Sequence, residues 1–185
     1  IVSDHAMYRF EIGADKIPVY TWRTAYDRGT TLKPGAINQG SGTTPTLLDV
    51  PCADGSIRKL VAITDNADEQ VHVVIYDRIT GEEIAAVPVF TKGKSVSENS
   101  LIAHGRSFIV ENNYSESGSG FLVNDPTSEP GVVRIDMNED CTDAFIPCIL
   151  NLLHALCQRK FFLNLLGNGK FPVEIHLHCS YLNFL

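Results

Sequence analysis

The stretch from Thr44 to Phe90 most constrains the fold of this 185-residue chain. It contains four short runs rich in β-branched and aromatic residues, TPTLLDV, LVAIT, VHVVIYD and IAAVPVF, separated by turn-forming clusters. Short apolar runs bounded in this way are typical of β-strands. Gly81 can also take the positive φ that a tight reversal after Asp77 requires. The stretch therefore predicts a four-stranded antiparallel meander, which needs neighbouring sheets because a single sheet of this size is not stable alone.

Partial copies of this unit lie on both sides of it. Residues 1–22 repeat the second, third and fourth runs, and residues 98–140 repeat the first three. Four-stranded repeats of roughly 40 to 50 residues are typical of β-propeller blades. The sequence thus predicts an all-β fold for residues 1–140, a partial β-propeller with about two to three four-stranded antiparallel blades at about 1–22, 44–90 and 98–140. Because a propeller closes only with about four to eight blades, we expect a fragment of a larger protein.

The sequence changes character at Cys141. Residues 141–185 contain no further copy, and no fourth run completes the third copy. The apolar residues from Phe145 to Leu166 have a helix-like spread that Pro147 interrupts. Two interpretations remain open for 141–185: a C-terminal helical segment, or a tail that is not native coding sequence, since its apolar residues show no regular period or capping.

The runs TPTLLD, LVAITDN and VVIYDRITGEE resemble the repeat of pyrroloquinoline-quinone (PQQ) type β-propellers. That repeat combines a Thr-Pro start, a Val-rich second strand ending in a small polar pair, and an aromatic-Asp-x-x-Thr-Gly hairpin. In the family a Trp after the Thr-Gly turn usually docks one blade against the next. Here Ala85, Ala86 and Val87 occupy that region, and the only Trp is Trp22 in the first copy. The resemblance implies a propeller fold and, as one alternative, a quinone-dependent dehydrogenase that binds PQQ.

Polar residues end the second strand of each predicted blade. Aligning the copies places Asp4, Asp65 and Asn112 at one position, and the loops that follow these strands should open on one face of a propeller. Oxygen donors from successive blades could then hold a hard cation, as Ca²⁺ requires. The sequence therefore predicts a calcium site whose ligands are Asp65, Asn66, Glu111 and Asn112.

This site would resemble the calcium-dependent gluconolactonase and regucalcin propellers. Asp4 or His5 would then act as a general base toward an ester or lactone carbonyl polarised by the metal. The alternative is structural: Asp and Asn at strand ends commonly bond their own backbone, so a recurring Asp-Asn pair is then only turn chemistry.

Composition narrows the classes of partner that this chain could bind. The net charge is −7, and residues 1–140 hold 20 of the 22 acidic residues, which argues against nucleic acid as a partner. No apolar run is long enough to cross a bilayer, so we expect a soluble protein. Four of the five cysteines fall after residue 140, so we expect no disulfide framework in the repeats, and the compartment, extracellular or periplasmic included, stays open.

Three functions remain as hypotheses. The first is a ligand-binding or interaction scaffold, in which the polar loop residues pair internally and a small molecule is one candidate ligand. The second is the calcium-dependent hydrolase, and the third is the quinone-dependent dehydrogenase. The oligomeric state is not indicated.

Overall fold

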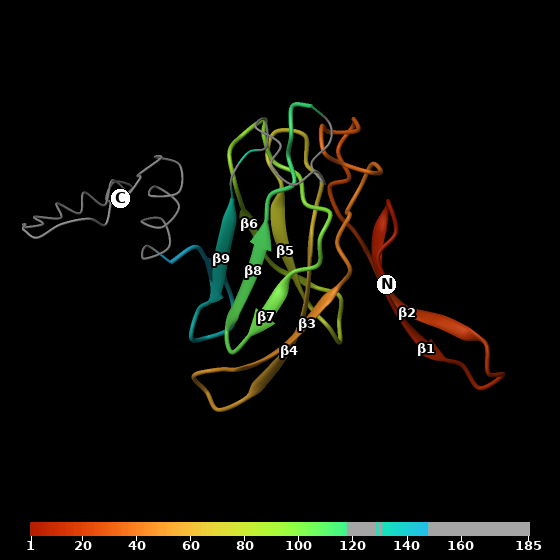
Figure 1. Ribbon diagram of the computed structural model, residues 1–185. Coiled ribbons are helices and arrows are strands. Elements are labelled where there is room, and N and C mark those ends of the chain that lie inside the picture. The colour runs from red at the N-terminus through yellow and green to blue at the C-terminus, as the bar shows by residue number, and fades with distance from the viewer. Residues whose placement is uncertain (118–128, 130, 148–185) are drawn as a thin grey trace, which may run out of the picture.

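The structure, a computed structural model, describes residues 1–117, 129 and 131–147. Within these residues all regular elements are β-strands and none is a helix. The strands form three antiparallel sheets that follow one another along the chain (Figure 1). The predicted all-β class is therefore confirmed.

The middle sheet is the meander that the sequence predicts. Its strands lie in chain order: β3 (Thr46–Pro51), β4 (Ile57–Thr64), β5 (His72–Asp77) and β6 (Glu83–Pro88). The turn from β5 to β6 forms as expected, because Gly81 has φ of 78° and Asp77 Oδ1 accepts hydrogen bonds from the backbone N–H groups of Ile79 (2.8 Å) and Thr80 (3.0 Å). An Asp at the start of a turn satisfies the backbone in this way.

The third sheet also has four strands: β7 (Ile102–His104), β8 (Ser107–Glu111), β9 (Val132–Met137) and β10 (Ala144–Phe145). The expectation that the third copy lacks a fourth strand was wrong, because Ala144 pairs with Met137 and Phe145 with Asp136. Two residues are too few to show a periodic pattern in the sequence. The predicted helix lies mostly in 148–185, outside the described residues, and the described part of the tail contains β10 instead.

The first sheet is a hairpin of β1 (Ala6–Ile12) and β2 (Pro18–Ala25). The strand expected in residues 1–5 is reduced to a bridge between Val2 and Met7 and two backbone hydrogen bonds between Ile1 and Tyr8. The register between β1 and β2 shifts between Arg9 and Phe10. The same shift occurs in the middle sheet between Ile75 and Tyr76, so Phe10 and Tyr76 hold equivalent positions.

The inner strands of the middle sheet, β4 and β5, have buried residues on both faces. Alternate residues of a strand face opposite sides, and accordingly Val73 and Ile75 join the larger core with the third sheet, whereas Val74 and Tyr76 join a smaller core with Met7 of the first sheet. This explains why β5 reads as a continuous apolar run in the sequence rather than an alternating one. The three sheets therefore pack face to face, with the middle sheet between the other two.

A disulfide links the middle and third sheets. Cys52, after β3, bonds Cys141, before β10, with their Cα atoms 5.6 Å apart and 89 positions apart in sequence. The expectation that the cysteines form no disulfide in the repeats was therefore wrong. It rested on counting Cys141 with the tail, whereas the third sheet continues past that residue.

Candidate functional site

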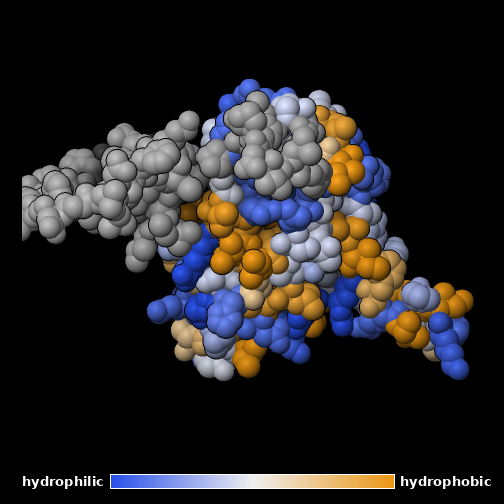
Figure 2. All heavy atoms as spheres, in the orientation of Figure 1, coloured by the Kyte–Doolittle hydropathy of each residue, from blue (hydrophilic) through white to orange (hydrophobic). Residues whose placement is uncertain are grey.

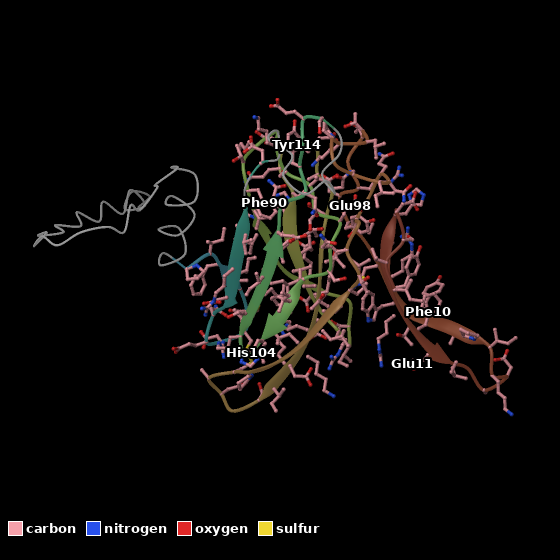
Figure 3. The ribbon with its side chains drawn as sticks, viewed as in Figure 1. Phe10, Glu11, Phe90, Glu98, His104 and Tyr114 are labelled. Atoms are coloured by element: carbon pink, nitrogen blue, oxygen red, sulfur yellow. A yellow bond between two sulfur atoms is a disulfide. The ribbon has the colours of Figure 1, made fainter. Side chains whose placement is uncertain are left out.

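Two long connections cross the same end of the middle and third sheets. In Figure 1 β8 points to this end, where residues 26–43 and 90–100 also lie, and Figure 3 shows Glu98 and Tyr114 here and His104 at the opposite end. We call this end the rim. It holds the residues that the sequence singles out around Asp65 and Asn112.

One polar residue per copy closes the turn after the second strand. The backbone N–H of this residue donates to the carbonyl that begins the third strand or precedes it: Ser3 to Ala6 (2.9 Å), Asp65 to His72 (3.0 Å) and Asn112 to Gly131 (2.9 Å). The equivalence of Asp65 and Asn112 is therefore confirmed. In the first copy the alignment was wrong by one residue, because Ser3 rather than Asp4 holds this position.

The side chains at this position cap the turn that follows. Each accepts a hydrogen bond from the backbone N–H two residues later: Ser3 Oγ from His5 (3.2 Å), Asp65 Oδ1 from Ala67 (3.4 Å), and Asn112 Oδ1 from Tyr114 (3.2 Å). This is the local pairing by which Ser, Asp and Asn favour turns. The recurrence of the residue is thus accounted for by backbone geometry.

The remaining predicted calcium ligands also pair within the protein. The buried Asn66 donates from Nδ2 to Arg28 O (3.0 Å), and Asn112 donates from Nδ2 to Lys94 O (3.0 Å). Glu111 Oε1 accepts hydrogen bonds from the side-chain amides of Asn99 and Asn113. These bonds fasten the two connections to the ends of the sheets.

Asp4 and His5, the predicted general bases, lie exposed next to each other. Asp4 Oδ2 is 3.1 Å from an Arg28 guanidinium nitrogen and 3.3 Å from His5 Nε2. Across residues 1–117, 129 and 131–147, no group of three or more His, Cys, Asp and Glu side chains is arranged to hold a metal ion. Two of the four predicted calcium ligands, Asn66 and Asn112, are not among these residue types, so the calcium site stays a prediction.

A histidine and a buried aspartate form a pair that the sequence does not reveal. His72 Nδ1 lies 2.8 Å from Asp65 Oδ2, and the His72 backbone N–H donates to Asp65 Oδ1 at 2.6 Å. Burial raises the pKa of the Asp65 carboxyl, although the hydrogen bonds from His72 act in the opposite direction. When Nδ1 carries the proton and donates it to Asp65, Nε2 carries the lone pair. A single His within an apolar run gives no signal for this pairing.

Lys33 is a second buried polar group at the rim. Its side chain is 9% exposed, and Nζ donates to the carbonyl oxygens of Ala67 and Ser95 (3.4 Å to the latter). Burial lowers the pKa of Lys33, and the carboxylates of Asp65 and Asp68 counteract this effect. Lys33 thus ties the first connection to both loops beneath it.

Trp22 joins the first sheet to the middle one. Its Nε1–H donates to Arg78 O at 3.2 Å, and its ring covers Gly81 so closely that a Cβ there would lie 2.6 Å from Cδ2. Thr24 Oγ1 donates to Gly81 O at 2.7 Å. Strand β2 therefore docks on the turn between β5 and β6.

A cleft of about 320 Å³ lies between β1 and the middle sheet. Its lining is mainly apolar and aromatic, and its charged members are two arginines. The lining residues are Ile1, Met7, Tyr8, Arg9, Phe10, Trp22, Pro45, Leu47, Val61 and Arg78.

No family model, curated protein or solved structure gives a significant match to this chain. Within the described part, no helix is both long and apolar enough to span a membrane.

Proposed function

We propose that this chain is part of a β-propeller of the PQQ-like repeat type and that it acts as a ligand-binding or interaction scaffold. The observation that carries the proposal is the internal pairing of the rim. Side-chain oxygens of Asp65, Glu111 and Asn112 accept hydrogen bonds from groups of the protein itself, and Asn66 pairs through its Nδ2. A scaffold needs these residues only to hold its loops, whereas a catalytic metal site would need their oxygens free to converge on one ion.

The contact of Trp22 supports the repeat type. In the related family a Trp after the third-to-fourth-strand turn docks one blade on the next, and Trp22 lies on the Gly81 turn of the following sheet. The face-to-face order of the three sheets also fits consecutive blades.

The disulfide favours an oxidising compartment for this protein. Bonds such as Cys52–Cys141 persist in oxidising surroundings and are rare in the cytosol. We therefore favour an extracellular or periplasmic location among those that the sequence leaves open.

A calcium titration tests the scaffold against the hydrolase. We expect the thermal unfolding midpoint to be the same in millimolar Ca²⁺ and in excess EDTA. If the protein bound Ca²⁺, a free Ca²⁺ concentration of about 100 times the Kd would instead raise the free energy of unfolding by about 2.7 kcal/mol. Stabilisation of this size, lost in Glu111→Gln but kept in the exposed-site control Glu69→Gln, would replace the scaffold with the calcium-dependent hydrolase.

The Asp65–His72 pair is the one observation that favours the hydrolase. A buried carboxylate that orients a histidine is the arrangement by which a general base is positioned. Under this second candidate His72, rather than His5, would be the base. Hydrolysis of a lactone or aryl ester that is lost in His72→Gln and retained in His5→Gln would support it. The quinone-dependent dehydrogenase stays a prediction, which redox activity restored by added PQQ would support.

A further inference from the structure

The disulfide lies where three turns meet, at the end of the sheets opposite the rim. Cys52 follows β3, Cys141 lies between β9 and β10, and Arg106 belongs to the turn between β7 and β8 (Figure 1). His104, in the same turn as Arg106, marks this end in Figure 3. Figure 2 shows hydrophilic residues around these turns at the lower left. The disulfide therefore lies near the surface of the molecule.

The two cysteines of this disulfide differ in exposure. Cys52 is half-buried and stands between the exposed Pro51 and Ala53, whereas Cys141 is fully buried. A Cβ at Gly55, three positions after Cys52, would meet no atom within 4 Å, so the turn that follows β3 opens to solvent. Because access decides which sulfur of a disulfide is attacked, we expect a thiol reagent to attack Cys52.

A guanidinium lies beside the buried sulfur. Arg106 Nη2 is 3.8 Å from Cys141 Sγ. Three carbonyl oxygens hold the guanidinium in this place: Nε donates to Met137 O at 3.3 Å, Nη1 donates to Pro51 O, and Nη2 donates to Asn138 O. Within the described part of the chain, Arg106 makes no ion pair with a carboxylate. Its positive charge can therefore stabilise a thiolate on Cys141.

Exposure and charge favour the same direction of thiol–disulfide exchange. In this reaction an attacking thiolate bonds one sulfur of the disulfide, and the other sulfur leaves as a thiolate. Attack on the accessible Cys52 makes Cys141 the leaving group, and Arg106 lies beside that sulfur. A stabilised leaving thiolate departs faster, so the environment of the disulfide favours its reduction.

The disulfide also holds a strand with few other bonds. Strand β10 has only two residue pairs with β9. Cys141 has φ of 59°, a left-handed conformation that is unfavourable for a residue with a Cβ. Beside the disulfide, the Ala53 N–H donates to Glu139 O at 2.8 Å and Arg58 donates to Cys141 O at 2.8 Å. When the disulfide opens, residues 138–145 should therefore loosen before the meander does.

We propose that Cys52–Cys141 is a redox-active disulfide, reduced by a dithiol, that controls the attachment of β10 and of the turn before it. One thiolate of the dithiol attacks Cys52 Sγ, the bond between the two Sγ atoms breaks, and its electron pair leaves on Cys141 Sγ beside Arg106. The second thiol of the dithiol then displaces Cys52 from the mixed disulfide. The dithiol is oxidised to a disulfide, and its two protons end on Cys52 and Cys141. This role goes beyond the proposed scaffold function and does not depend on it.

The site of attack is tested on the unaltered protein with reduced glutathione, a monothiol. Samples are quenched in acid, alkylated and mapped by mass spectrometry, which separates this pair from Cys148, Cys157 and Cys179. We expect glutathione on Cys52 and a free thiol on Cys141, in at least about tenfold excess over the reverse product, because access selects the sulfur that is attacked. Equal amounts of the two products, or an excess of glutathione on Cys141, would overturn the proposal.

The role of Arg106 is tested by the rate at which dithiothreitol reduces the disulfide, measured by the same mapping. Arg106→Met should be reduced at least about threefold more slowly than the unaltered protein, because the leaving thiolate loses its cation, and Arg106→Lys should recover part of the rate. Arg58→Met is the matched control: it frees Cys141 O but leaves Arg106 beside the sulfur, so reduction should not slow. If Arg106 only held the turns together, Arg106→Met would be reduced as fast or faster, and this outcome would refute its role.

Amide hydrogen exchange of the oxidised and reduced protein tests the conformational effect. Reduction should speed exchange in residues 138–145 and leave Ile63 and Val74, which pair in the centre of the middle sheet, protected. Unchanged exchange in 138–145, or an equal loss of protection at Ile63 and Val74, would rule out a local release of β10. None of these outcomes bears on the calcium titration, so the redox role and the scaffold role can fail separately.

Discussion

Replacing Gly81 with Ala tests the contact between the first two sheets. Gly81 has φ of 78°, where a side chain costs roughly 1–2 kcal/mol. In addition, a Cβ at this position would lie 2.6–2.8 Å from Trp22 ring atoms, and such crowding costs about 1–3 kcal/mol. Gly81→Ala should therefore lower the free energy of unfolding by about 2–5 kcal/mol.

Gly55 provides a matched control. Its φ is 83°, but nothing lies within 4 Å of the position of a Cβ, so Gly55→Ala carries only the backbone cost of about 1–2 kcal/mol. The excess of Gly81→Ala over Gly55→Ala measures the contact with Trp22. In a Trp22→Ala background this excess should disappear, because the ring that crowds the Cβ is gone.

Urea denaturation followed by far-UV circular dichroism measures all of these variants, including those without Trp22. In the presence of Trp22 the fluorescence of this only Trp gives an independent report on the same contact. Equal costs of Gly81→Ala and Gly55→Ala in the unaltered background would refute the docking of β2 on the Gly81 turn.

Three further changes probe the disulfide and the rim. Replacing both Cys52 and Cys141 with Ser should lower the free energy of unfolding by about 4–5 kcal/mol, because the disulfide closes a loop across 89 positions and reduces the entropy of the unfolded chain. Peptide mapping without reductant should find the two cysteines linked. Absence of the linked peptides would contradict the disulfide. Asp65→Asn should remove a pH dependence of the free energy of unfolding. Because burial raises the pKa of Asp65 above 3.8, its contribution to stability is fully present below pH 3.8 and is lost as the pH rises through the raised value. In urea titrations at several pH values, the unaltered protein should therefore lose stability relative to Asp65→Asn as the pH rises from 3.8, and a relative gain would contradict this. Lys33→Met should cost about 1–3 kcal/mol in the same assay, since it leaves Ala67 O and Ser95 O without their donor; no cost would mean that neither bond matters for stability.

The middle sheet could be predicted from the sequence because each of its strands is long enough to give a clear signal. The runs around Val74 and Leu60 are apolar and β-branched, and the turn after Asp77 combines Asp, Thr and Gly at the positions that such turns require. The recurrence of a polar residue at the strand end was also recognisable, since Asp65 and Asn112 follow similar runs. What the sequence could not decide was whether that residue serves a turn or an ion, because both use the same oxygen atoms.

The errors have a common physical origin in contacts between distant segments. Strand β10 has only two residues and forms by pairing with β9, so no local sequence pattern predicts it. The pair of Cys52 and Cys141 depends on the third sheet continuing past Cys141, and the pair of Asp65 and His72 depends on how β4 and β5 are aligned. The shift from Asp4 to Ser3 is visible only in hydrogen bonds, because Ser and Asp both cap a turn from one oxygen.

The two interfaces between sheets are held by different chemistry at corresponding places. The shared register shift makes Ala85 the equivalent of Trp22, since Ile75 pairs with Ala85 as Arg9 pairs with Trp22. At the first interface the Trp22 ring covers the turn of the next sheet. At the second interface Ala85 and the fully buried Cys141, which lies before β10, belong to the same core.

Covalent and polar bonds hold this second turn in place of a Trp ring. Cys141 is joined to Cys52, and its carbonyl accepts a hydrogen bond from Arg58 at 2.8 Å. The small residue at position 85 therefore does not leave the second interface open. It follows that Ala85→Trp should lower the free energy of unfolding, because the large ring would overpack the core to which Ala85 and Cys141 both belong.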